Sequence, residues 1–181
     1  SDAGLIPMML PDYQKVADGE KREWFESFWE TELHDKPGFT VTEIMDKVFA
    51  DESDPDKIRG LYVMGENPAM SDPNLNHARS ALAHLEHLVV QDIFITETAW
   101  LADVILPASA WPEKNGTVTN TDRMVQMGRK AIEPPGDAKE DLWIIQKLAS
   151  GLGLNWNYTG PDCGVEAVYD EMRHAMKDSI W

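Results

Sequence analysis

The chain has 181 residues, of which 43% are hydrophobic, and this size fits one folded domain with a smaller appendage. No apolar run approaches the roughly 20 residues needed to cross a bilayer, and no basic stretch followed by an apolar block marks a signal peptide. The formal net charge of −16 argues against a partner held through a phosphate backbone. We therefore expect a cytoplasmic protein that binds neither nucleic acid nor membrane.

The only cysteine, Cys163, limits the chemistry that this chain can contain. An intrachain disulfide and a cysteine-rich metal or iron–sulfur site are both excluded. No base partner is evident for Cys163, which indicates a passive thiol. Residues 1–5 resemble the middle of a polypeptide, so we expect the chain to be a segment of a larger protein.

Residues 1–57 are expected to form an irregular and helical segment. Pro7 and Pro11 oppose a regular helix or a central strand near its start. Aromatic residues at helical spacing then predict a helix over 20–33 that packs one face in a core. Thr40 and Glu43 have the spacing of a capping box and predict a second helix. The expected buried face of that second helix is Val41, Ile44, Met45, Val48 and Phe49.

Residues 58–154 are expected to form a parallel α/β domain. Three short apolar runs, at 61–64, 88–90 and 104–106, have the solid hydrophobic character of strands buried on both faces. Helices are predicted over 72–85 and 139–150, and a helical turn over 97–101. A glycine-, asparagine- and threonine-rich loop at 115–120 precedes a β-like stretch at 124–126. The predicted fold is a Rossmann-like three-layer αβα domain, followed over 155–181 by a loop and a helix from about residue 165 to 177.

Polar residues follow the predicted strands, where ligands bind in open parallel sheets. Gly65 would let the backbone turn close to a ligand, while Glu66 and Asn67 offer an acceptor and an amide. Asp92 and Thr96 follow the second strand, and Asp92 has an acceptor for a ribose or for the amino edge of guanine. The sequence lacks both the G-x-G-x-x-G fingerprint and a phosphate-binding G-x-x-x-x-G-K-[ST] loop, which disfavours NAD or ATP bound directly by this segment.

The order and spacing of several short motifs over residues 60–153 resemble one known domain. That domain is the third domain of the molybdopterin-guanine-dinucleotide oxidoreductases, and within this family the sequence is most similar to formate dehydrogenase catalytic subunits. Residues 1–14 also resemble the segment that follows a pterin-contacting motif in those subunits. The motifs that carry the resemblance are 65–68, 90–94, 96–99, 102–107, 113–117, Asn120, Asp122-Arg123 and the helix containing Trp143.

The resemblance implies a cofactor and a set of contacts. The cofactor is a bis-pterin guanine dinucleotide (bis-MGD) carrying molybdenum or tungsten, and the 65–67 turn would lie against one dinucleotide arm. Asp92 and Thr96 would contact its nucleoside portion, and Asp103 would cap the nucleotide pocket. The remaining implied residues, which would face or brace the cofactor channel, are Gly116, Thr117, Asn120 and Arg123.

The same resemblance implies what lies outside the chain. The family's metal-ligating cysteine or selenocysteine, its partner histidine and arginine, and its iron–sulfur cysteines have no counterpart here, so we expect the isolated segment to be inactive. The complete subunit would oxidise formate to carbon dioxide by two electrons. Its partners would be the remaining domains of the subunit and electron-transfer subunits that bind NAD or flavin. Two alternatives stay open: a non-catalytic scaffold domain of the same fold in a large electron-transfer complex, and another reductase of the family, such as a nitrate reductase.

Overall fold

The computed structural model describes residues 6–160 and 164–176, and the chain divides into two compact units. The first comprises Ser1–Thr40 with Glu166–Trp181, and the second comprises Val41–Val165. No helix in the described ranges has the length and apolar character that crossing a membrane requires. The three-part division expected from the sequence stays a prediction.

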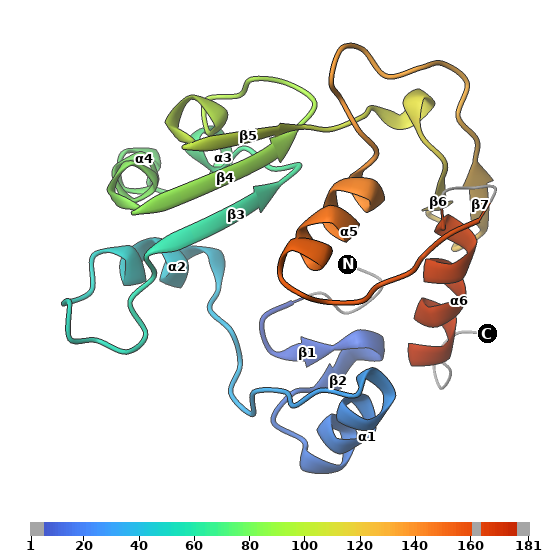
Figure 1. Cartoon of the computed structure of the whole chain (residues 1–181). Helices are drawn as coiled ribbons and strands as arrows, with labels where there is room; N and C mark the ends of the chain where they lie inside the picture. Colours follow the sequence, from blue (N-terminus) through green and yellow to red (C-terminus); the bar gives the residue numbers. More distant parts are fainter. Residues whose placement is uncertain (1–5, 161–163, 177–181) are drawn as a thin grey trace. The chain divides into compact units, whose positions relative to one another are not determined.

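The first unit combines a small antiparallel ribbon with two helices (Figure 1). The ribbon pairs β1 (Met9–Leu10) with β2 (Gln14–Lys15) across a 3-10 turn, η1 (Pro11–Tyr13). Helix α1 (Gly19–Trp29) begins at Asp18, whose carboxylate accepts the Lys21 N–H. It ends four residues earlier than expected, because Glu30 adopts a left-handed conformation that terminates the helix. The carboxyl-terminal helix is α6 (Val165–Ala175).

The aromatic face of α1 forms the core of this unit. Phe25 is almost completely buried, and Leu10 and Ala175 contact the same cluster. Trp24 stacks on Phe28 with ring centroids 5.1 Å apart. The helical spacing of these aromatic residues therefore reports core packing, as predicted.

A three-stranded parallel sheet organises the second unit. Its strands β3 (Gly60–Met64), β4 (His87–Asp92) and β5 (Val104–Pro107) are neighbours in chain order, and all three arrows in Figure 1 point the same way. Helices α3 (Pro68–Ser71) and α4 (Leu75–His84) connect β3 to β4, while the short turn η2 (Ala99–Leu101) precedes β5. Helix α2 (Val41–Val48) packs against α4. The α/β class with a parallel sheet is thus confirmed.

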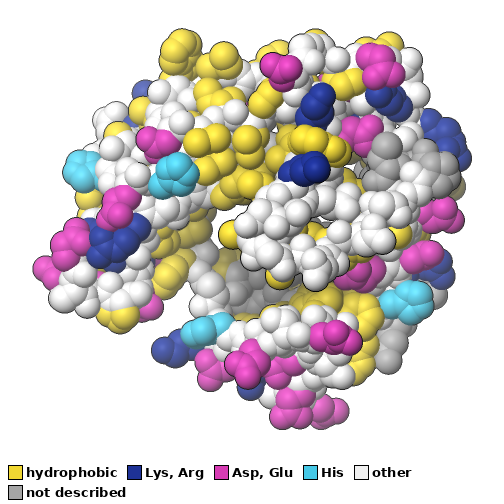
Figure 2. Space-filling model, in the orientation of Figure 1, with side chains coloured by type: hydrophobic (Ala, Val, Ile, Leu, Met, Phe, Trp, Pro, Cys, Tyr) yellow, Lys and Arg dark blue, Asp and Glu magenta, His cyan; other side chains and the backbone are white. Residues whose placement is uncertain are grey.

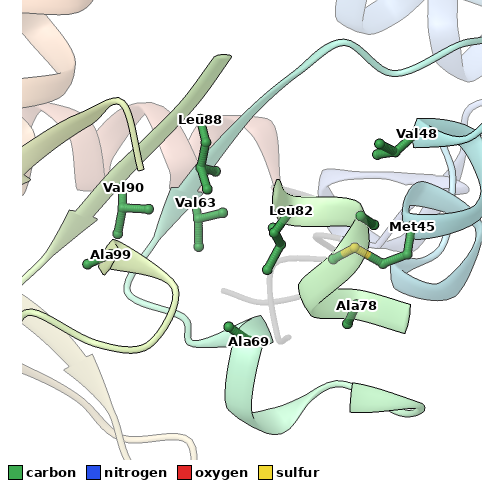
Figure 3. Packing of buried hydrophobic residues seen from close by; sticks show 10 residues of the cluster. Met45, Val48, Val63, Ala69, Ala78, Leu82, Leu88, Val90 and Ala99 are labelled. Atoms are coloured by element: carbon green, nitrogen blue, oxygen red, sulfur yellow. The ribbon is translucent and has the colours of Figure 1, made fainter. Parts of the chain in front are cut away.

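One face of this sheet carries the main hydrophobic core (Figure 3). Val63 of β3 and the β4 residues Leu88 and Val90 point toward Leu82 of α4 and Met45 of α2. Each of these side chains is less than one-tenth exposed. Burial of a side chain of this kind stabilises the fold by about 1.5–3 kcal/mol, so this layer holds α2 and α4 against the sheet.

The opposite face of the sheet is partly open, so the expectation that the strands are buried on both faces is wrong. Tyr62, Met64 and Val104 are between 38% and 48% exposed, and Figure 2 shows hydrophobic side chains gathered over these strands. Gln91 is the fully buried exception on this face, and its side chain bonds to the Tyr62 hydroxyl. The face therefore combines exposed apolar groups with one satisfied buried amide.

Three sequence-based expectations for this unit need correction. The helix predicted from residue 72 is two helices, because Asp72 ends α3 and α4 begins only at Leu75. The stretch predicted as a loop at 115–120 contains β6 (Gly116–Thr119), which pairs with β7 (Val125–Gly128) as an antiparallel hairpin after the turn η3 (Trp111–Glu113). The expected buried face of α2 is also too wide, since Val41 is 48% exposed and Phe49, which lies beyond the end of α2, is 42% exposed. The predicted helix at 139–150 is confirmed as α5 (Asp141–Gly151).

Candidate functional site at the carboxyl edge of the sheet

The parallel register brings the carboxyl ends of β3, β4 and β5 together. The Gly65 N–H donates to the Gln91 carbonyl at 2.9 Å, and the Ala108 N–H donates to the Asp92 carbonyl at 3.0 Å. Asp92 also faces Pro107 in the strand register. The three turns that leave the sheet are therefore neighbours at one edge, the place where ligands bind in open α/β sheets.

Gly65 gives this edge an open turn. Its φ of +64° is a left-handed conformation that side chains with a Cβ rarely adopt. No atom lies within 4 Å of the position that a Cβ would take, and both Gly65 and Glu66 are exposed. A ligand can thus approach this backbone closely.

Asn67 has an internal role that the sequence did not reveal. Its carbonyl oxygen accepts from the backbone N–H of Thr98 at 3.2 Å and from the Thr98 hydroxyl at 2.8 Å. Its amide nitrogen donates to Glu97 at 2.8 Å, and this hydrogen bond is the main reason that the pKa of Glu97 lies below its usual value. Both ends of the amide are engaged, so Asn67 braces the β3 turn against the segment after β4.

Asp92 and Thr96 shape the loop after β4. One carboxylate oxygen of Asp92 accepts the N–H groups of Ile93 at 2.6 Å and Phe94 at 3.3 Å. The Thr96 hydroxyl accepts the Ala99 N–H at 3.2 Å and so braces the loop against the start of η2. Because these bonds use one oxygen of Asp92, its second carboxylate oxygen is the acceptor that the strand end presents.

Two buried polar atoms near this edge have no hydrogen-bond partner among the described residues: one carboxylate oxygen of Asp72 and the Ser109 hydroxyl. Burial, followed by the nearby Glu66 charge, raises the pKa of Asp72 above its ordinary value. Ser109 is 1% exposed and lies two residues after the end of β5. Unsatisfied buried polar groups are rare in folded proteins. Here Asp72 follows α3 and Ser109 follows β5, so both residues belong to segments that leave the carboxyl edge.

Asp103 lies at the other end of the same strands. It precedes β5, and its carboxylate accepts the Leu88 N–H at 2.7 Å, while its own N–H donates to the Leu88 carbonyl at 2.9 Å. His87 is 3.8 Å from the same carboxylate oxygen. The structure thus separates Asp103 from Gly65 and Asp92 and gives it a role in closing the amino edge.

Four further expected site residues belong to the β6–β7 hairpin. Gly116 and Thr117 pair with Gly128 and Met127 in its ladder. Asn120 and Arg123 form the exposed turn at its tip, where the Arg123 N–H donates to the Asn120 carbonyl at 2.8 Å. No hydrogen bond or ion pair of the described residues joins this turn to the strand ends.

A polar network next to the site was not predicted from the sequence. The Gln91 amide donates to Asp141 of α5 at 2.7 Å, and Lys114 forms an ion pair with the same carboxylate. Lys114 also donates to the Ser109 carbonyl at 3.1 Å. The one signal of this network in the sequence is Gln91 itself, a polar residue at the end of an apolar strand. Its partner Asp141 is 50 residues away, so no local pattern links the two residues.

The carboxyl edge is polar and mostly acidic, and its acidic groups do not assemble a metal centre. Among the described residues, no group of three or more histidine, cysteine, aspartate or glutamate side chains is arranged to hold a metal ion. Cys163 lies outside these residues. The chemistry available at the edge is therefore hydrogen bonding by an open glycine turn and by carboxylates.

Comparison with known proteins identifies the class to which this fold and edge belong. A family model described as molybdopterin oxidoreductase matches residues 36–151, and the chain belongs to this family. Among its relatives is the F420-dependent formate dehydrogenase subunit alpha of Methanocaldococcus jannaschii, 49% identical over 174 residues, or 95% of this chain. Formate dehydrogenase H of Escherichia coli is 38% identical over 178 residues, or 98% of this chain.

The chain spans about a quarter of these relatives, since each match covers 24% of the relative's length. A solved structure, acetylene hydratase from Pelobacter acetylenicus, superposes with a TM-score of 0.57 over 77% of this chain and 20% of its own. At 24% sequence identity this likeness concerns the fold alone. The resemblance inferred from the motifs is therefore confirmed at the level of the family.

Proposed function

We propose that this chain is the cofactor-holding domain of a formate dehydrogenase catalytic subunit, and that its carboxyl sheet edge binds one guanine-dinucleotide arm of a bis-pterin cofactor with molybdenum or tungsten. The observation that carries the proposal is the convergence of the Gly65 turn and Asp92 at one edge of a parallel sheet. The names of the relatives support formate as the substrate of the whole enzyme.

The edge fits the nucleoside end of such a cofactor. The presented carboxylate oxygen of Asp92 is a natural acceptor for the amino edge of guanine, and the open Gly65 turn gives a ligand access to the backbone. Bound cofactor supplies the two-electron oxidation of formate, while these residues bind and orient it.

The proposal assigns the expected contacts by their place in the fold. Glu66, Asp92 and Thr96 stay in the proposed site with Gly65, whereas Asn67 supports it from within. Asp103 is not part of the proposed site, because it lies at the amino edge. The contacts proposed from the family resemblance alone are those of Gly116, Thr117, Asn120 and Arg123.

The proposal extends to the environment of the enzyme. The remaining domains of the subunit complete the cofactor site, and separate electron-transfer subunits accept the electrons. The designation "subunit alpha" of the Methanocaldococcus jannaschii relative supports such an assembly. Iron–sulfur clusters belong to parts outside this chain, the location is cytoplasmic, and the isolated chain has no formate dehydrogenase activity.

Asp92→Asn in a formate dehydrogenase alpha subunit that carries this chain tests the proposed contact. An amide in place of the carboxylate loses the charge-assisted acceptor, so cofactor retention should fall by about tenfold. The measurement is the amount of GMP released by acid per polypeptide, together with the molybdenum and tungsten content. Asp103→Asn is the matched control and should leave both amounts unchanged. Full GMP content in Asp92→Asn would refute the assignment of this carboxylate.

A further inference from the structure

A hollow of the Val41–Val165 unit lies on α5 and shares no lining residue with the strand-end site. It has a volume of about 630 Å³, within the roughly 300–1,000 Å³ typical of small-molecule sites. Its walls come from α5, from the segment before it and from the loop after it. Neither the family resemblance nor the proposed function assigns a role to this hollow.

Three aromatic side chains line the hollow. Trp143 on α5 and Trp156 in the following loop are 47% and 49% exposed. Tyr158 contacts Trp156 edge-on with ring centroids 6.1 Å apart, and its backbone N–H donates to Gln146 of α5 at 3.1 Å. The loop that carries two of the rings is thereby fastened to the helix that carries the third.

Lysines stand beside these rings. Lys139 and Lys147 line the hollow, and within the described part of the chain neither forms a salt bridge. The ammonium of Lys147 lies 5.5 Å from the centroid of the Trp143 ring. Lys130 is paired with Glu133, and Glu140 is the other acidic residue of the lining.

The charge balance of the hollow is opposite to that of the chain. Three lysines against two glutamates give its lining a formal charge of +1, whereas the whole chain carries −16. In so acidic a chain, two lysines that form no salt bridge with the described residues, beside half-exposed indoles, indicate a site for a ligand that has both a ring and negative charge. Aromatic side chains stack on the flat ring of any nucleobase, and ammonium groups bind phosphate.

We propose that this hollow is a nucleoside phosphate site in which Trp143 and Trp156 offer stacking faces to the base and Lys139 and Lys147 contact the phosphates. The site is independent of the strand-end site, because Gly65 and Asp92 are absent from its lining. Its volume favours a small molecule over a peptide laid along an extended surface.

Calorimetric titration of the chain with ATP and with GTP tests this proposal. Saturable binding is expected, and Trp156→Leu should weaken it about tenfold because a stacking face is lost. Lys147→Gln should weaken it about fivefold, while Lys147→Arg should preserve most of it. Trp100→Leu is the matched control, since Trp100 is 78% exposed and does not line the hollow, and its affinity should equal that of the unchanged chain.

Two further ligands separate the contributions of ring and phosphate. Inorganic tripolyphosphate and adenosine should each bind at least tenfold more weakly than ATP. Tripolyphosphate binding as tightly as ATP would show that the rings are unused and would overturn the proposal, as would the absence of saturable binding. Binding lost in Asp92→Asn but retained in Trp156→Leu would overturn it in favour of the strand-end site, so the two proposals fail separately.

Discussion

The two ends of the same three strands differ in how their polar groups are used. At the amino end, Asp103 and the backbone of Leu88 satisfy each other, and Arg59 pairs with Glu86 beside them. At the carboxyl end, Gly65 is open and Ser109 has a buried hydroxyl without a partner among the described residues. This sheet thus closes its amino edge with its own side chains and leaves an open backbone turn at its carboxyl edge, and four substitutions can test this division.

Asn67→Ala should have the largest effect, because it removes the internal brace of the carboxyl end. The buried Thr98 would lose its partner for both N–H and hydroxyl, which is expected to cost about 3 kcal/mol of unfolding free energy. Urea unfolding followed by circular dichroism measures the loss. Thr98→Val removes the hydroxyl that Asn67 accepts from. In a double-mutant cycle, Asn67→Ala should therefore cost less unfolding free energy in the Thr98→Val background. Strictly additive costs would contradict the role of Asn67 as a brace.

Asp103→Ala should destabilise the amino end without touching the ligand edge. The N–H of the buried residue Leu88 loses its carboxylate acceptor, at an expected cost of about 2 kcal/mol. The same denaturation measurement applies. The full subunit should keep a normal GMP content despite its lower stability. If the variant lost more cofactor than its lower stability accounts for, the distinction between the two ends would be wrong.

Gly65→Ala sharpens the comparison through a matched glycine. Gly65 and Gly136 both have positive φ, and neither has an atom within 4 Å of a Cβ position, so alanine at either should cost about 1 kcal/mol through backbone strain alone. Thermal unfolding measures this cost. GMP retention should fall only in the Gly65 variant, and equal retention in both variants would show that the open turn does not face the cofactor.

Asp72→Asn should have the smallest effect and a characteristic pH dependence. Burial and the Glu66 charge raise the folded-state pKa of Asp72 above its ordinary 3.8, so the folded protein holds this proton more tightly than the unfolded chain. The ionised carboxylate therefore destabilises the fold above the raised pKa, and this penalty disappears as pH falls below 3.8.

The asparagine variant should accordingly gain about 0.5 kcal/mol at neutral pH and lose this advantage on acidification. Melting temperatures from pH 3 to pH 7 provide the measurement. Asp137→Asn, at an exposed position, is the control. A gain that is constant with pH would show that titration of Asp72 is not its cause.

The sheet was predictable because its signal is local. The strands β3, β4 and β5 are short apolar runs between turn residues, and buried parallel strands require that pattern. Parallel strands also place the residues that follow each strand at a common edge of the sheet. The proximity of Gly65 and Asp92 could therefore be predicted from the sequence. The role of Asp103 in the nucleotide pocket was instead inferred from the family resemblance. Asp103 precedes β5, so the topology places it at the amino end of the strands, opposite Gly65 and Asp92.

The remaining features of the site depend on contacts between distant residues. Asn67 meets Thr98 across 31 positions, and Gln91 meets Asp141 across 50, so no local pattern announces either bond. The hairpin strand β6 was missed because Gly116 and the threonines around it have the composition of a loop. Their predicted contacts with the cofactor stay predictions.

The turn at Asp92 has a practical consequence for anyone who handles this polypeptide. Its carboxylate accepts the N–H groups of Ile93 and Phe94 and so holds a loop with a hydrophobic tip that faces water. In this tip Phe94 is 73% exposed and Ile95 is 63% exposed. Excluded salts such as ammonium sulfate strengthen contacts between tips of this kind. Concentrated samples should consequently self-associate more as such salt is added, even though the chain's strong negative charge keeps dilute samples apart.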